Sequence, residues 1–152
     1  MSNDKVIKQI EFEIEKIEKL LRSYHQLIKI SEVTEPDLIQ ITALASVVHS
    51  FYNGIENIFQ TISKKVDGHV PDSRQWHRDL LKEMCRSTDK RSAVISPELM
   101  LKLSEYLGFR HFYRHAYSYQ LEWEELKSLV FNLETTWEML KNALEQFLKQ
   151  IR

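Results

Sequence analysis

Apolar residues recur at spacings of three and four along most of the chain, which is the period of an amphipathic helix. The first such stripe is Val6, Ile10, Ile14, Ile17, Leu21, Tyr24 and Ile28. The second is Ile41, Leu44, Val48, Phe51, Ile55, Ile58 and Ile62. The last and most regular is Leu126, Val130, Leu133, Trp137, Leu140, Leu144, Phe147 and Ile151. Its alternating steps of four and three predict the seam of near-parallel helix packing. The pattern therefore predicts three long helices.

Start and stop signals place two shorter helices between the long ones. Pro36 suits the first position of the second long helix. Ser73 is a candidate cap for a third helix over 73–86, and the polar stretch 87–96 follows as a connector. Ser96, with Pro97 and Glu98 behind it, favours a fourth helix that runs through Tyr106. Gly108 is then expected to close that helix as its C-terminal cap.

The predicted fold class is all-α, a helical bundle of about five helices in which three are long and two short. Only 3 glycines and 3 prolines occur in 152 residues, too few for a domain with many tight turns. No repeat or low-complexity tract interrupts the chain. We therefore expect a single helical domain over residues 1–152.

Composition limits the range of functions. Apolar residues make up 43% and charged residues 28%, the balance of a soluble globular protein. The net charge is -1, so any surface that binds a polyanion must be a local patch. The lone thiol of Cys85 is expected in the core, and a cytoplasmic location suits a chain without an internal disulfide. The longest uncharged run, residues 38–55, predicts a buried helix and no membrane span.

The stretch "FRHFYRHAY", residues 109–117, gathers two arginines, two histidines and two tyrosines. A metal site is one interpretation, because His111 and His115 are four residues apart and share a helix face. No third ligand is evident, and two arginines oppose a cation. A structural interpretation is also open, with the aromatic residues in the core and the polar ones at its rim.

Phosphate chemistry is the third interpretation of this stretch. The guanidinium groups of Arg110 and Arg114 match phosphate oxygens, and an imidazole exchanges protons near neutral pH. Histidine and arginine together suffice for RNA cleavage without a metal: the imidazole deprotonates a 2′-hydroxyl, and arginine stabilises the charge on the phosphoryl oxygens. Arg110 and His115 are five residues apart, about 140° around a regular helix. A bend at Gly108 or a second subunit is needed to bring them together.

The spacing of Arg110, His115 and Tyr117 resembles the R-x-x-x-x-H-x-Y signature of HepT-like toxins in the HEPN ribonuclease superfamily. A polar residue usually follows the arginine in that superfamily, and here it is His111. "FYNGIENIF", residues 51–59, also resembles the helix of that family at the corresponding place. The chain departs from the family pattern at Phe112, Tyr113 and Arg114, where aliphatic residues are typical.

The resemblance implies a HEPN-like helical domain that works as a homodimer and needs no cofactor. It implies a metal-independent endoribonuclease toxin, acting on RNA and often on tRNA, with Arg110 and His115 catalytic and with His111 and Arg114 in support. It also implies a partner, a nucleotidyltransferase antitoxin encoded nearby, which attaches AMP to Tyr117.

A second candidate surface is the basic stripe of Arg74, Arg78, Lys82 and Arg86, which step by four along the third predicted helix. We define these four residues as the basic stripe and expect it to bind RNA. The alternative is a solvated face on which Asp79 and Glu83 pair with the neighbouring cations.

Two rival functions remain open at this level. One is a non-catalytic HEPN-type binding or regulatory subunit of a nucleotidyltransferase, and the other is a purely structural helical adaptor. Both rivals share the helical bundle with the ribonuclease. The need for Arg110 and His115 in RNA cleavage separates the ribonuclease from them.

Overall fold

The structure is a computed structural model that describes residues 3–152. These residues form seven α-helices, and the single β-bridge among them joins Thr88 to Arg91. The helices are α1 (Asp4–Ser23), α2 (His25–Val33), α3 (Leu38–Ile62), α4 (Trp76–Met84), α5 (Pro97–His115), α6 (Trp123–Phe131) and α7 (Leu133–Ile151). A short π-helical turn (Ser63–Asp67) extends α3, and a 3₁₀ turn (Ser118–Gln120) precedes α6. The all-α prediction is confirmed.

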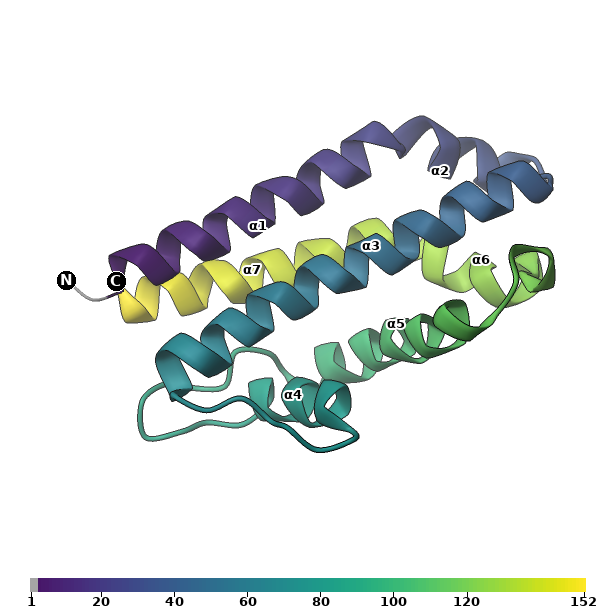
Figure 1. Ribbon diagram of the computed structural model, residues 1–152. Helices are drawn as coiled ribbons and strands as arrows, with labels where there is room; N and C mark the ends of the chain where they lie inside the picture. The colour runs from purple at the N-terminus through teal and green to yellow at the C-terminus, as the bar shows by residue number, and fades with distance from the viewer. Residues whose placement is uncertain (1–2) are drawn as a thin grey trace.

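Helix α3 is the central element of the bundle. In Figure 1 it runs between α1 and α7 on one side and α4 and α5 on the other, while α2 and α6 lie together at one end. Twelve of its residues are buried, including Phe51, Ile55 and Phe59. By length and composition alone, α3 with its π-helical extension is also apolar enough to cross a membrane. Its burial by the surrounding helices gives it the environment of a core helix.

The apolar stripes predicted from the sequence form one continuous core. Val6, Ile10, Ile17 and Leu21 of α1 are buried against the α3 stripe. The seam of the last predicted helix is also buried, apart from Ile151, which is half-buried. The termini lie side by side (Figure 1), where the Asn3 side-chain amide donates to the Ile151 carbonyl at 2.9 Å.

Two predicted long helices are each divided once. The first ends at Ser23, and α2 begins at His25 after Tyr24 departs from helical geometry. The last is split at Asn132, whose side chain donates back to the Ser128 carbonyl at 2.8 Å. An asparagine that bonds its own backbone in this way competes with helix continuation. The apolar spacing continues through both breaks, which is why periodicity alone predicted one helix in each case.

Three predicted helix ends are wrong. Helix α3 starts at Leu38, directly after Asp37, and not at Pro36. The Asp37 carboxylate accepts from the backbone N–H of Gln40, and the Gln40 side-chain oxygen accepts from the backbone N–H of Asp37, so the two residues form a capping box. Helix α4 begins at Trp76, because the Ser73 hydroxyl accepts from the Gln75 amide in a preceding turn. Gly108 does not end α5, which continues to His115. By contrast, the Ser96 hydroxyl accepts from the Leu99 amide and caps α5 as predicted.

Candidate functional site

A groove of about 740 Å³ lies between α4 and α5, and it joins the two surfaces singled out in the sequence. Arg74, Arg78 and Lys82 line one wall, and Arg110 and His111 line the other. The apolar side chains of Leu81, Met100 and Leu107 contribute to its lining. Because α5 continues as a helix past Gly108, Arg110 and His111 lie on the same wall of the groove as the earlier residues of α5.

The basic stripe enters the groove only in part. Arg86 follows the end of α4 and borders a separate hollow beside Asp67 and Glu83. Arg91, farther along the connector, is buried and forms a two-pronged ion pair with Asp67 at 2.7 and 2.8 Å. That arginine holds the connector in place, so it is not part of a nucleic-acid surface.

The alternative of internal pairing along the stripe does not hold in this structure. Asp79 accepts from the Ser73 hydroxyl at 2.7 Å, and Glu83 faces His69 at 3.6 Å. Within residues 3–152, no carboxylate lies within 4.0 Å of the charged group of any stripe residue. The groove therefore has a cationic wall without neutralising partners, which suits an anionic ligand.

A side chain of α3 orients the guanidinium of Arg110. Its Nε donates to the Asn53 side-chain oxygen at 3.2 Å. The other end of the amide, Nδ2, lies 3.1 Å from His49 Nε2. An amide nitrogen only donates, so His49 accepts through Nε2 and is neutral in this arrangement. The chain from Arg110 through Asn53 to His49 fixes the plane of the guanidinium while its terminal nitrogens remain available.

His49 is kept neutral by its surroundings. Burial lowers its pKa, and the positive charges of Arg110 and Arg114 lower it further. Its ring packs on Tyr113 with centroids 4.6 Å apart. Its Nδ1 is buried and has no hydrogen-bond partner within the described chain. Tyr113 is therefore half-buried against His49.

His77 is held at the groove by a buried carboxylate. Its Nδ1 lies 2.7 Å from Glu56 Oε2, and Glu56 is only 5% exposed. Trp76 stacks on the imidazole with centroids 3.6 Å apart. Nearby, burial raises the pKa of the Tyr52 phenol, and the negative charge of Glu56 raises it further. The phenol is therefore neutral at physiological pH.

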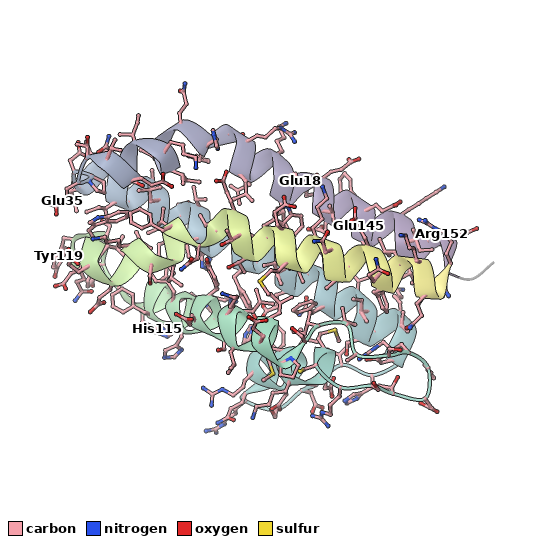
Figure 2. The ribbon with its side chains drawn as sticks, turned by 180° about the vertical axis from the view of Figure 1, so that it is seen from behind. Glu18, Glu35, His115, Tyr119, Glu145 and Arg152 are labelled. Atoms are coloured by element: carbon pink, nitrogen blue, oxygen red, sulfur yellow. The ribbon has the colours of Figure 1, made fainter. Side chains whose placement is uncertain are left out.

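His115 lies at the exposed end of α5 and does not line the groove. Its Nδ1 is 2.9 Å from the His111 carbonyl oxygen, which only accepts, so Nδ1 carries the proton and Nε2 holds the free lone pair in the neutral ring. Figure 2 shows the side chain projecting away from the bundle. Helix α5 has no bend that would turn His115 toward Arg110, so the two signature residues do not share one face within a protomer.

The other candidate residues of this stretch, His111, Arg114 and Tyr117, are exposed. The ring of His111 lies 5.0 Å from that of His115, and Arg114 is exposed. Tyr117 is 71% exposed and stacks on the equally exposed Tyr119. Among residues 3–152 no group of three or more histidine, cysteine, aspartate or glutamate side chains is placed to hold a metal ion.

Sequence reasoning missed four members of this site. His49, Asn53 and Glu56 come from α3, and His77 comes from α4 beside the basic stripe. A signal was present, because 49, 53 and 56 are polar positions at helical spacing within an otherwise apolar segment. Polar groups on one face of a buried helix usually have partners, but their partners lie 21 to 57 residues away.

Comparison with known proteins gives one match. A family model described as HepT-like protein matches residues 43–151, a span that runs from α3 to the end of α7 and includes the whole groove. No curated protein and no solved structure matches the chain.

Proposed function

Because the chain belongs to the HepT-like family of the HEPN superfamily, we propose that it is a metal-independent endoribonuclease that acts as the toxin of a toxin–antitoxin pair. The observation that carries this proposal is the cationic groove, in which Arg110 faces the three members of the basic stripe that line it, with no carboxylate among the described lining residues. Such a groove matches the phosphodiester backbone of RNA. A cytoplasmic location, where tRNA and mRNA are available, completes the proposal.

The residues supply the steps of RNA cleavage by internal attack. Nε2 of His115 removes the proton from a 2′-hydroxyl, and the 2′-oxygen attacks the adjacent phosphorus. Arg110, held in plane by Asn53, donates to the phosphoryl oxygens as negative charge develops. His111 and Arg114 contribute further donors at the rim. The products are a 2′,3′-cyclic phosphate and a free 5′-hydroxyl.

Assembly as a homodimer is part of the proposal. His115 projects outward from α5 and lies on a different face from Arg110, so one protomer alone does not bring the two groups to one phosphate. A second copy that packs against the α5 ends supplies the missing face. Mixed dimers with one wild-type and one His115→Ala subunit are then expected to lose much of the activity, whereas a fully active monomer in sedimentation experiments would remove this part of the proposal.

Control by a nucleotidyltransferase antitoxin rests on Tyr117. Its phenol is the exposed one that follows the signature histidine, whereas Tyr113 is packed on His49. Attached AMP adds an anion that competes with RNA phosphate for Arg110 or Arg114. Mass spectrometry of protein co-expressed with the antitoxin is expected to find adenylate on Tyr117, and Tyr117→Phe is expected to retain cleavage while escaping control. Adenylate on Tyr119 instead would move the modification site.

The direct test of the proposed function is RNA cleavage in EDTA with matched variants. Arg110→Ala and His115→Ala are each expected to lower the cleavage rate by about 10²–10⁴-fold, since one removes charge stabilisation and the other the base. Both side chains lie outside the core, so the melting temperature is expected to remain close to that of the wild type. Full cleavage by either variant would contradict the assignment. Absence of cleavage in the wild type would favour the non-catalytic binding module.

RNA binding by the groove is tested separately from cleavage. Arg78→Glu together with Lys82→Glu is expected to weaken binding to single-stranded RNA. Each lost phosphate contact reduces the slope of log affinity against log salt concentration by about 0.7. Arg86→Glu is a matched charge reversal outside the groove and is expected to change the slope less. If the two sets of substitutions change this slope equally, the stripe affects RNA binding only through the overall charge of the protein and not through contacts in the groove.

A further inference from the structure

We propose that His77 is a second catalytic residue of this groove, the general acid that protonates the 5′-oxygen leaving group, and that Glu56 positions it. This inference rests on the proposed ribonuclease function. It concerns a residue outside the arginine–histidine signature, contributed by α4 and held by α3.

The first argument is the tautomer that Glu56 imposes. The carboxylate only accepts hydrogen bonds, and it lies 2.7 Å from Nδ1 of His77, so Nδ1 carries a proton. The nitrogen left to act on a ligand is then Nε2, at the other edge of the ring. Within residues 3–152 no hydrogen bond is formed by Nε2. An imidazole oriented by a carboxylate with its second nitrogen free is the arrangement that acid–base catalysis requires.

The second argument is location. His77 lines the same groove as Arg78 and Arg110, and its side chain is 22% exposed, enough to reach a bound ligand. His111 is the other imidazole in the groove, and no side chain among residues 3–152 hydrogen-bonds to its ring, which lies 5.0 Å from the ring of His115. His77 is therefore the groove imidazole whose position is fixed.

The third argument is the geometry of the reaction. In-line attack places the entering 2′-oxygen and the leaving 5′-oxygen on opposite sides of the phosphorus. The base and the acid must therefore flank the phosphate that Arg110 binds. His115 lies beyond the groove at the end of α5, and His77 lies inside it on α4. In the proposed dimer the base is His115 of a second copy, so His77 is the positioned imidazole that the groove itself supplies to act as the acid.

The step balances without any further reactant. The 2′-oxygen loses its proton to His115 and forms a bond to phosphorus, while the bond from phosphorus to the 5′-oxygen breaks. His77 enters the step as the imidazolium, with both ring nitrogens protonated. The 5′-oxygen takes the electron pair of the broken bond and the proton from Nε2 of His77, which leaves the neutral ring with its proton on Nδ1. Both imidazoles return to their starting states by exchange with water.

A purely structural role is the alternative, because a buried carboxylate needs a partner and the pair ties α4 to α3. The substitution His77→Asn separates the two roles. The asparagine side-chain nitrogen occupies the place of Nδ1 and still donates to Glu56, but nothing replaces Nε2. His69→Asn is the matched control, since His69 is an exposed histidine that faces Glu83 outside the groove.

The experiment compares two RNA substrates in EDTA, one natural and one with sulfur in place of the 5′-bridging oxygen at the scissile bond. A thiolate leaves without protonation because thiols are far more acidic than alcohols. On the natural RNA, His77→Asn is expected to lower kcat about 10²–10⁴-fold, to leave KM close to the wild-type value and to lose the alkaline limb of the pH–rate profile. On the sulfur substrate it is expected to regain most of the wild-type rate, whereas His115→Ala is not.

Each other outcome overturns the inference. Wild-type kcat in His77→Asn shows that Nε2 is not used. A low kcat that sulfur does not restore assigns His77 to positioning or to folding, and the melting temperature tells these apart. Cleavage that requires His115 but not His77 leaves the proposed function standing and removes only this inference. A wild-type protein that cleaves neither substrate removes both.

Discussion

The two faces of α3 differ in what they pack against. Toward α1 the helix presents Gly54, and a β-carbon there would come within 2.8 Å of Ile17 Cγ1, so the two helices meet closely at an apolar contact. Toward α4 and α5 it presents Asn53 and Glu56, each bonded to a side chain of the groove. One helix therefore supplies both the tightest apolar contact and the supports of the site.

This difference teaches how a small helical protein keeps a polar site rigid. Burial of a carboxylate and an amide costs free energy unless each is paired. Packing of the apolar face fixes the position of α3 and so offsets this cost. The fixed helix then orients Arg110 through Asn53 and His77 through Glu56. Substitutions on the apolar face are therefore expected to change stability, and those on the polar face to change activity.

The largest effect is expected from Phe51→Ala. Phe51 is fully buried, and its ring makes edge contacts with Tyr106 and Trp137, which join α3 to α5 and α7. Truncation leaves a cavity and is expected to lower the free energy of unfolding by about 3–5 kcal/mol. Urea denaturation measures this directly. A loss below about 1 kcal/mol would mean that the bundle does not depend on this junction.

The contact between α3 and α1 is tested by Gly54→Val, which brings branched carbons against Ile17. Overpacking of this kind is expected to lower the free energy of unfolding by about 1–3 kcal/mol. The matched control is Gly108→Ala, because α5 is helical there and the space around Gly108 is open. That control is expected to raise stability by up to about 1 kcal/mol. If both substitutions act in the same direction, the close approach of α1 is not the cause.

On the polar face, Asn53→Ala removes the acceptor that orients Arg110. We expect RNA cleavage to fall about tenfold, which corresponds to roughly 1.4 kcal/mol in the activation free energy, and stability to change little. Asn57→Ala, one turn along α3 and bonded toward Glu13 of α1, is the matched control and is expected to retain activity. Equal losses in the two variants would point to a general effect on α3.

The smallest effect is expected from acid. Burial and the two guanidiniums lower the pKa of His49 in the folded protein, while the unfolded chain keeps the ordinary value near 6.5. The unfolded state therefore binds more protons below that pH. Stability is complete above about pH 6.5 and falls as the pH drops toward the lowered value. His49→Gln is expected to lose this part of the pH dependence, and denaturation curves between pH 7.5 and 5.5 measure it. An unchanged dependence would mean that folding does not lower the pKa of His49.

Sequence periodicity predicted the helices and their buried stripes, because those depend on neighbours three and four residues away. The resemblance to HepT-like toxins, and not periodicity, singled out Arg110, His115 and Tyr117, and their roles stay predictions. Sequence reasoning failed at Gly108, where a residue that often ends helices lies in the middle of α5. The helix end that was wrongly predicted at Gly108 hid the fact that Arg110 belongs to the same helix as the rest of the groove wall.

The tertiary partners could not be read from the sequence. Glu56 reaches His77 across 21 positions, and Asn53 reaches Arg110 across 57. Local spacing carries no information about such distances along the chain. The basic stripe shows the same limit. Its spacing of four grouped Arg86 with three residues of the groove, but α4 ends at Met84 and Arg86 borders a different hollow.

The central claim is that this groove cleaves RNA by attack of the 2′-hydroxyl. The most direct measurement follows one short RNA and an otherwise identical strand with a single 2′-deoxy nucleotide on the 5′ side of the cleaved bond, both in EDTA. We expect the RNA to yield a 2′,3′-cyclic phosphate and the deoxy strand to remain intact at that bond. Cleavage of the deoxy strand there, or loss of RNA cleavage on chelation of metals, would contradict the account.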